Sequence, residues 1–228
     1  MTTIILNILC EGQTEEKFVK EVLKGHLLPH VVCKTQILET SHKKNQRGGI
    51  LSYQQVCRDL TRWMKSVARR TSETHYFTTM LDFYRLPADF PSYAVAMGRP
   101  NSLEKVAALE IAFSLDIQHP RFIPYIQLHE FEALVFCGLS HLKREYPNAQ
   151  QEINQLETLL QNTYEGNPEL INNSVHTAPS KRIIRAIEKY YRYNKPKSGA
   201  AVTAQVGIDN LRRKCPHFDE WVCKLERL

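Results

Sequence analysis

Acidic side chains stand directly after three apolar runs of this sequence. They are Glu11 after residues 3–10, Asp82 after 75–81, and Glu130 and Glu132 after 122–128. If these runs are neighbouring parallel strands, their carboxyl ends meet in the crevice where open α/β sheets bind ligands. Carboxylates held close together repel one another unless a cation neutralises them, and an all-oxygen ligand set suits Mg²⁺ or Mn²⁺. The pattern therefore predicts a site for a divalent cation.

Each of these acids also has a purely structural interpretation. Glu11 could end its strand by accepting bonds from backbone N–H groups of the following turn, and Asp82 could cap the turn after its own strand. Glu15 and Glu16 lie in the first turn of a predicted helix, where the helix dipole favours acids in any case. Both interpretations stay open at this stage.

The motif His129-Glu130-Phe131-Glu132 opens a predicted helix that runs to about Phe136. Glu130 and Glu132 are two residues apart and would not share a face of a regular helix. We therefore expect one of them to bind the cation directly, and we favour Glu132. His129 is either an acid/base or positioning group beside the site or a structural histidine.

The positive charge of the chain is concentrated in residues 181–197. This segment holds seven basic residues and one acid, a formal charge of 7 − 1 = +6, which equals the net charge of all 228 residues. Its helix follows a proline, and an N-terminus carrying Ser, Lys and Arg can hold a phosphate. The residues expected to contact nucleic acid are Ser180, Lys181, Arg182, Arg185, Lys189, Arg192 and Lys195. The alternative is a solvated helix face with the tyrosines 190, 191 and 193 packed inward.

Hydrophobic periodicity places these residues on an α/β scaffold. Apolar runs predict strands at 3–10, 32–39, 75–81 and 122–128, the last interrupted by Pro124. Helical patterns fall between them at about 14–27, 53–69 and 102–115, with a polar, basic loop at 42–49. We therefore expect a mostly parallel sheet with helices on both faces over residues 1–140, and a helical C-terminal region, 141–228, packed on this core.

Composition excludes several classes of protein. Hydrophobic residues make up 43% and charged residues 24%, which are ordinary globular values. The sequence has no apolar run of about 18 residues and no signal-peptide pattern, so we expect no membrane segment. The six cysteines form no C-x-x-C pair, which favours reduced thiols over a zinc site and predicts a cytoplasmic protein.

Several motifs together resemble a known family. The opening Glu11-Gly12-Gln13-Thr14-Glu15-Glu16 is similar to the first motif of Toprim domains, in the version found in OLD-family (overcoming lysogenization defect) nucleases. Leu81-Asp82-Phe83-Tyr84 resembles the second Toprim element, although Tyr84 stands where many members carry a second aspartate. With the motifs 124–134, 178–182 and 215–221, nearly the whole chain resembles a bacterial and archaeal family of Toprim-like proteins of unknown function.

The resemblance implies a Toprim-type, Rossmann-like core that binds Mg²⁺ or Mn²⁺. The implied metal ligands are Glu11, Glu15, Asp82 and Glu132, with Glu130 or Glu132 as a substitute for the missing second aspartate. Lys181 would contact the phosphate, and His129 and Tyr84 would hold the ligands in place. Similar nucleases work in defence systems with an ABC-type ATPase; this chain has no G-x-x-x-x-G-K-[ST] motif, so such an ATPase would be a separate protein.

These observations lead to one hypothesis and two rivals. The leading hypothesis is a metal-dependent nuclease that cleaves phosphodiester bonds, with Glu11, Asp82, Glu132 and Lys181 as catalytic residues. The first rival is a non-catalytic module that binds nucleic acid or an ATPase partner, which the tyrosine at position 84 favours. The second is primase-like nucleotidyl transfer, which no accompanying zinc domain supports. Self-association into a homo-oligomer stays open.

Overall fold

The computed structural model describes residues 3–39, 49–70, 72–171, 174 and 176–228. Its centre is a five-stranded sheet in which every strand pairing is parallel, in the order β2-β1-β3-β4, with β5 also paired to β3. The strands are β1 (Thr3–Cys10), β2 (Val31–Ile37), β3 (Glu73–Asp82), β4 (Phe122–Ile123) and β5 (Ile126–Gln127). The predicted α/β fold class is confirmed.

The strands β1 and β3 occupy the middle of the sheet because their residues are apolar on both faces. Leu6, Ile8 and Cys10 are fully buried on one face of β1, and Leu9 is fully buried on the other. The run predicted at 122–128 divides into two short strands, β4 and β5, on either side of Pro124. A proline cannot donate a ladder hydrogen bond, so the interruption occurs at the predicted place.

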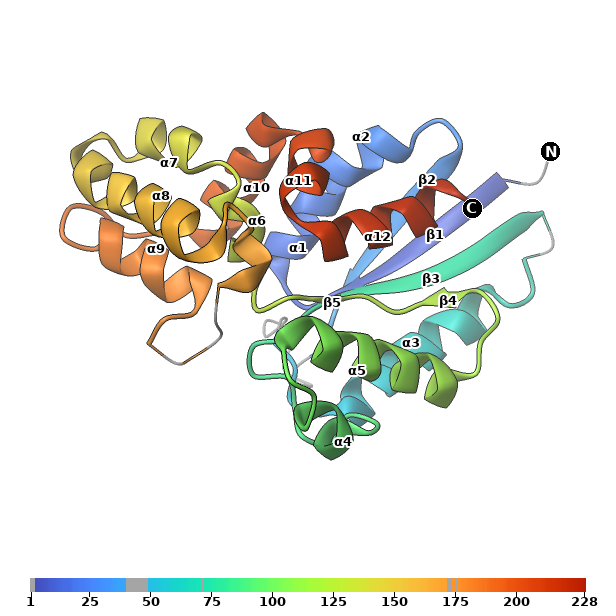
Figure 1. The fold of residues 1–228 in the computed structure, drawn as a ribbon. Coiled ribbons are helices and arrows are strands. Elements are labelled where there is room, and N and C mark those ends of the chain that lie inside the picture. The colour runs from blue at the N-terminus through green and yellow to red at the C-terminus, as the bar shows by residue number, and fades with distance from the viewer. Residues whose placement is uncertain (1–2, 40–48, 71, 172–173, 175) are drawn as a thin grey trace.

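Helices cover both faces of the sheet (Figure 1). On one face lie α3 (Tyr53–Val67), α4 (Tyr93–Met97) and α5 (Ser102–Ile117). On the other lie α1 (Gln13–Phe18), the π-helical turn η1 (Val19–Leu23), α2 (Lys24–Leu27), α11 (Ile208–Lys214) and α12 (Pro216–Glu226). Helix α4 lies between the strand predicted at 75–81 and the helix predicted at 102–115, where the sequence analysis predicted no helix. Residues 42–48 of the predicted loop lie outside the described part.

A second group of helices extends beyond the carboxyl ends of the strands, at the left of Figure 1. Its members are α6 (Glu132–Phe136), α7 (Leu139–Glu145), η2 (Pro147–Ala149), α8 (Gln150–Tyr164), η3 (Pro168–Leu170) and α9 (Pro179–Ile187), with α10 (Lys195–Val206) joining them to α1. None of the helices in the described part of the chain is both long enough and apolar enough to cross a membrane.

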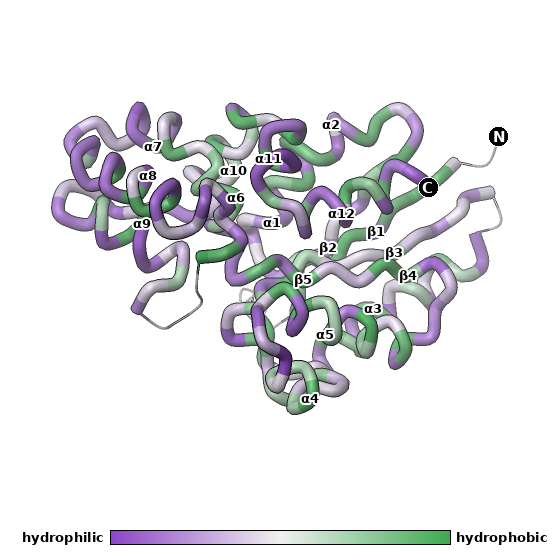
Figure 2. The backbone as a smooth tube through the Cα atoms, viewed as in Figure 1, coloured by the Kyte–Doolittle hydropathy of each residue, from purple (hydrophilic) through white to green (hydrophobic). Residues whose placement is uncertain are grey.

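The C-terminal helices share one hydrophobic core with the sheet. Phe218 and Trp221 of α12 and Leu6 and Ile8 of β1 belong to the same cluster of buried side chains. Trp221 also donates from Nε1 to Thr78 Oγ1 of β3 at 2.9 Å. Apolar residues follow the strands of the sheet, whereas α8 is largely hydrophilic (Figure 2). The helical region therefore packs directly on the α/β core.

Candidate functional site

The ends of β1 and β3 hold Glu11 and Asp82 side by side. The backbone N–H of Glu11 donates to Met80 O at 3.0 Å, which extends the β1–β3 ladder by one residue. The backbone N–H of Asp82 in turn donates to Glu11 Oε2 at 2.9 Å. The two carboxyl groups predicted at neighbouring strand ends are therefore brought together, because the parallel register ends both strands at one edge.

Glu15 joins this edge from the first turn of α1. Its Oε2 accepts a 2.8 Å bond from the backbone N–H of Gly12, which satisfies one of the free N–H groups at the helix start. A Cβ at position 12 would lie 3.3 Å from that same oxygen, so glycine leaves room for the bond. Glu15 therefore caps the start of α1, in the first helical turn where an acid is favoured. It also lies beside Glu11.

The segment after β5 contributes the next acids. The backbone N–H of Phe131 donates to Asp82 Oδ1 at 2.9 Å, which places the start of α6 against the end of β3. Glu132 opens α6 and is 2% exposed. The backbone turns at His129, which has a φ of 64° and accepts a 2.7 Å bond from Tyr84 N–H.

The carboxylate of Glu130 is bound to the start of helix α9. Its two carboxylate oxygens accept from the backbone N–H of Ser180 at 2.8 Å and from Ser180 Oγ at 3.0 Å. Glu130 therefore caps the N-terminus of α9, which was expected to hold a phosphate. A protein carboxylate occupies that position instead. The preference for Glu132 over Glu130 as a cation ligand agrees with this geometry.

The lysine beside the acids is Lys195, whereas Lys181 was expected there. Lys195 Nζ lies 3.2 Å from Glu132 Oε2 and 4.0 Å from Glu130 Oε1. It begins α10, which packs closely on α1 because Gly199 has no side chain. A Cβ at Gly199 would lie 3.0 Å from Thr14 Cγ2 and 3.1 Å from a Phe131 ring carbon. This close approach brings Lys195 over the acids.

Burial and mutual repulsion change the protonation of the strand-end acids. Burial, and then the nearby Glu15 carboxylate, raise the pKa of Glu11 to about 8, against the lowering effect of the Asp82 N–H bond. Burial together with the carboxylates of Glu11, Glu15, Glu132 and Glu130 raises the pKa of Asp82 well above its ordinary value. Burial also raises the pKa of Glu15. A desolvated cluster of acids therefore retains protons when no cation is bound.

The charges of Glu132 and Lys195 partly neutralise one another. Burial raises the pKa of Glu132 to about 7 with the help of the Glu130 and Glu15 carboxylates, although Lys195 works against the rise. Burial disfavours the charged form of Lys195, but the carboxylates of Glu132, Glu130 and Asp82 outweigh it and raise its pKa. The ammonium group is therefore held charged beside the acids.

The donor set fits a hard divalent cation. With all five acids ionised and Lys195 charged, the formal charge is −5 + 1 = −4 (Glu11, Glu15, Asp82, Glu130 and Glu132 with Lys195). Among the described residues, however, no three His, Cys, Asp or Glu side chains stand close enough to form a ready-made metal cage. Mg²⁺ is commonly held by one or two carboxylates with waters and substrate phosphates completing its shell. Of the acids at this edge, Glu11, Asp82 and Glu132 are those from which one or two would hold it.

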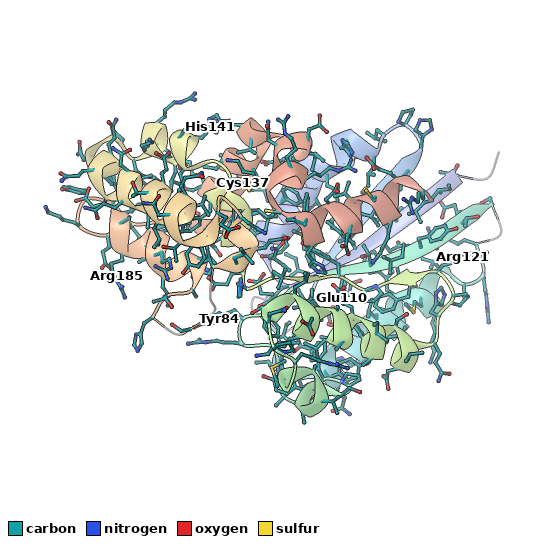
Figure 3. The ribbon with its side chains drawn as sticks, viewed as in Figure 1. Tyr84, Glu110, Arg121, Cys137, His141 and Arg185 are labelled. Carbon is teal, nitrogen blue, oxygen red and sulfur yellow. The ribbon has the colours of Figure 1, made fainter. Side chains whose placement is uncertain are left out.

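The predicted nucleic-acid contacts lie mostly on the outside of the α8–α9 region. Lys181, Arg185, Lys189 and Arg192 are exposed, and Arg185 points away from the body of the protein in Figure 3. Arg182 instead has a structural position: its Nε donates to Thr177 O at 2.7 Å and another guanidinium nitrogen donates to Tyr164 Oη. The basic segment therefore divides into exposed cations, one packed arginine and Lys195 in the acid cluster.

His129 and Tyr84 each bury a polar atom that has no partner within the described residues. These atoms are His129 Nδ1 and Tyr84 Oη. Burial lowers the pKa of His129 to about 4, so the ring is neutral at pH 7, and its Nε2 bonds to Glu169 O at 3.0 Å. Because a neutral ring with Nε2 donating leaves Nδ1 as an acceptor, His129 is suited to a structural role more than to proton transfer.

Sequence reasoning missed Tyr193 as a member of the site. Its hydroxyl is also buried without a partner in the described part of the chain. Burial and the charges of Glu132, Tyr146, Glu145 and Glu130 raise its pKa well above the ordinary value, so the hydroxyl lies near the acids and keeps its proton. The sequence analysis named it only as one of the tyrosines packed inward beside the basic segment, because nothing in its local sequence links it to Glu132.

The fold and site define an α/β protein with a cluster of carboxylates and one lysine at the carboxyl edge of a parallel sheet. The chain belongs to the family described as domain of unknown function (DUF4276), whose model matches residues 10–226. No curated protein and no solved structure matches the chain.

Proposed function

We propose that this protein is a Mg²⁺- or Mn²⁺-dependent nuclease that cleaves phosphodiester bonds. The observation that carries the proposal is the strand-end cluster in which Glu11, Asp82 and Glu132 share one desolvated edge with Lys195. A cation bound there would supply charge neutralisation at the scissile phosphate and an activated water. The resemblance to Toprim domains of OLD-family nucleases supports the same reaction.

Each group of residues would have a separate role in the proposed reaction. Glu11 and Asp82 are held by backbone bonds through one oxygen each, so the other oxygen of each can face a cation. Lys195 would contact the phosphate and offset charge that develops on it, the task first assigned to Lys181. The exposed Lys181, Arg185, Lys189 and Arg192 would contact the nucleic-acid backbone, making binding salt-sensitive.

A non-catalytic module that binds nucleic acid or an ATPase partner is the second candidate. It is favoured by Tyr84 at the position of the second Toprim aspartate and by the lack of a three-ligand metal cage in the described residues. In either case we propose a cytoplasmic protein that works with a separate ABC-type ATPase. That partner would supply the nucleotide hydrolysis for which this chain carries no phosphate-loop motif.

Cleavage assays with and without the metal separate these candidates. Supercoiled plasmid, single-stranded DNA and RNA are incubated with the protein and Mn²⁺, Mg²⁺ or EDTA. A nuclease cleaves at least one substrate with metal only, and Glu11→Gln lowers the rate by at least about 100-fold while the variant stays folded. Binding without cleavage by the wild type, even with its ATPase partner added, would support the module.

A further inference from the structure

Two cysteines meet in the interior of the protein, between α6 and α12. Cys137, labelled in Figure 3, follows the last residue of α6, and Cys215 precedes the first residue of α12. Their Sγ atoms are 3.5 Å apart, although 78 residues separate them in the sequence. All six cysteines are free thiols, and within the described part of the chain no other two of them are in contact. The proposed nuclease reaction uses neither thiol.

The two sulfur atoms are close enough to form a disulfide after a small movement. A disulfide bond is about 2.04 Å long, so the sulfurs have to approach one another by roughly 1.5 Å. Both cysteines are cap residues at helix ends, so neither is held within a regular helix on both sides. Rotation of the two side chains, with a small shift of one helix end, therefore supplies the movement that the bond requires.

The two thiols differ in their access to an oxidant. Cys137 is 8% exposed and Cys215 is 0% exposed, so a small oxidant such as hydrogen peroxide reaches Cys137 first. Burial, and then the contact with Cys137, raise the pKa of Cys215 well above its ordinary value, although Lys214 opposes the rise. Cys215 is therefore a protected thiol that can react with an oxidised neighbour but is inert toward an oxidant in solution.

We propose that Cys137 and Cys215 are a redox-active pair, which a peroxide converts to an intramolecular disulfide that joins α6 to α12. The Cys137 sulfur attacks one peroxide oxygen, the O–O bond breaks, and the second oxygen leaves as water with the thiol proton, so that Cys137 becomes a sulfenic acid. The Cys215 sulfur then attacks the Cys137 sulfur, the S–O bond breaks, and that oxygen leaves as water with the Cys215 proton. Both sulfurs are oxidised, one peroxide is reduced, and a dithiol reductant reverses the change.

The disulfide joins two segments that support the acid cluster. Helix α6 begins at Glu132, five residues before Cys137. Two backbone N–H groups at the start of α12 donate to the Glu169 carboxylate at 2.9 and 3.0 Å. The carbonyl oxygen of Glu169 is in turn bonded to His129 Nε2 at 3.0 Å. A covalent link between α6 and α12 therefore holds together the segments that carry His129 and Glu132 when an oxidant is present.

Close packing around Cys137 favours a link within one molecule. The next residue, Gly138, lies directly on α10, since a Cβ at this position would be 2.5 Å from Val206 Cγ2 and 2.6 Å from Val202 Cγ1. Lys214 Nζ also donates to Cys137 O at 3.1 Å. These contacts hold the backbone of Cys137 in the interior, facing the sulfur of its own chain. The disulfide closes a loop that contains helices α7 to α11.

Mass spectrometry of peroxide-treated protein tests the proposal. The folded protein is treated with hydrogen peroxide, then unfolded, alkylated and digested without reductant. We expect a peptide pair linked through Cys137 and Cys215 in the wild type and in Cys33→Ala, and no such pair in Cys137→Ala. Cys33 is half-buried and contacts no other cysteine of the described chain, which makes it the matched control. Alkylation of both paired thiols at a peroxide dose that oxidises Cys33, or oxidation of Cys137 to a sulfinic acid without a link, would overturn the proposal.

Thermal unfolding tests whether the disulfide stabilises the protein. A link between residues 78 positions apart restricts the unfolded chain, so the oxidised wild type should melt at least about 5 °C above the reduced protein. Dithiothreitol should remove the difference, and Cys137→Ala treated in the same way should show none. An oxidised wild type that melts at or below the temperature of the reduced protein would contradict a stabilising link between α6 and α12. Neither experiment requires a cation or a nucleic acid, so both are independent of the proposed function.

Discussion

The Glu11 carboxylate accepts a 2.9 Å hydrogen bond from the backbone N–H of Asp82. This bond joins the ends of β1 and β3 and fixes one oxygen of Glu11, while Asp82 is fixed in the same way by Phe131 N–H. Both acids are therefore oriented by the backbone before any cation arrives. Such preorganisation is expected of a binding site and is costly for the empty protein, because the desolvated carboxylates repel one another.

The empty protein should lose stability as the pH rises. Glu11 and Glu132 have folded-state pKa values of about 8 and about 7, above the unfolded value of 4.5. The folded state then binds more protons than the unfolded state between about pH 4.5 and about pH 8, so the free energy of unfolding falls across this window. Urea unfolding at pH 5.5 and pH 8.5 in EDTA measures the effect. Rising stability over this range, the usual behaviour of paired acids, would contradict the raised pKa values.

A divalent cation should reverse this loss. Binding to ionised Glu11, Asp82 and Glu132 stabilises the folded state by an amount that grows with the logarithm of the ligand concentration, and more at pH 8.5 than at pH 5.5, where protons compete. Melting temperatures with and without Mn²⁺ at both pH values measure it. Glu11→Gln should abolish the difference, whereas Glu21→Gln, on the exposed side of η1, should retain it.

Lys195 and Lys181 should differ in their effects on cleavage. Lys195→Ala removes the ammonium group 3.2 Å from Glu132, and we expect cleavage to fall by about 10²–10³-fold. Lys181→Ala removes an exposed cation and should weaken nucleic-acid binding without a comparable loss of rate at saturating substrate. Single-turnover rates and salt-dependent binding of both variants separate the two roles. Equal losses of cleavage rate in the two variants would instead assign Lys181 to the catalytic site.

Glu130 should contribute to stability through α9. Glu130→Ala leaves the Ser180 N–H and hydroxyl without their buried acceptor and should lower the free energy of unfolding by about 1–3 kcal/mol. Glu188→Ala, at the exposed C-terminal end of the same helix, should have little effect or be slightly stabilising because an acid is unfavourable there. Urea denaturation measures the free energy of unfolding of both variants. Similar losses in the two would argue against a capping role for Glu130.

The α/β fold could be predicted because the signals were local. Buried apolar runs, turn residues and Pro124 defined the strands, and the parallel order then required Glu11 and Asp82 to meet at one edge. Four acids of the candidate site follow from strand ends, whereas Glu15 lies in the first turn of α1 and was assigned from the Toprim resemblance. Helix α4 was missed because it is one short turn within a proline-containing segment.

The roles of Lys195 and Glu130 could not be predicted because they depend on contacts distant in sequence. Lys195 reaches Glu132 across 63 residues, and only the close packing at Gly199 places it there. Glu130 is separated from Ser180 by 50 residues, and the local sequence of each gives no sign of the other. Periodicity specifies which face of a helix is buried, but it does not specify which helix start meets which loop.

Mn²⁺ binding by isothermal titration calorimetry tests the central claim most directly, because it requires neither the substrate nor an ATPase partner. The wild type, Asp82→Asn and the exposed control Glu21→Gln are titrated at pH 8.5, where the acids are most readily ionised. We predict saturable binding by the wild type and Glu21→Gln that Asp82→Asn weakens by at least about 100-fold. Absence of binding by the wild type, or equal binding by all three, would contradict a cation site at the ends of β1 and β3.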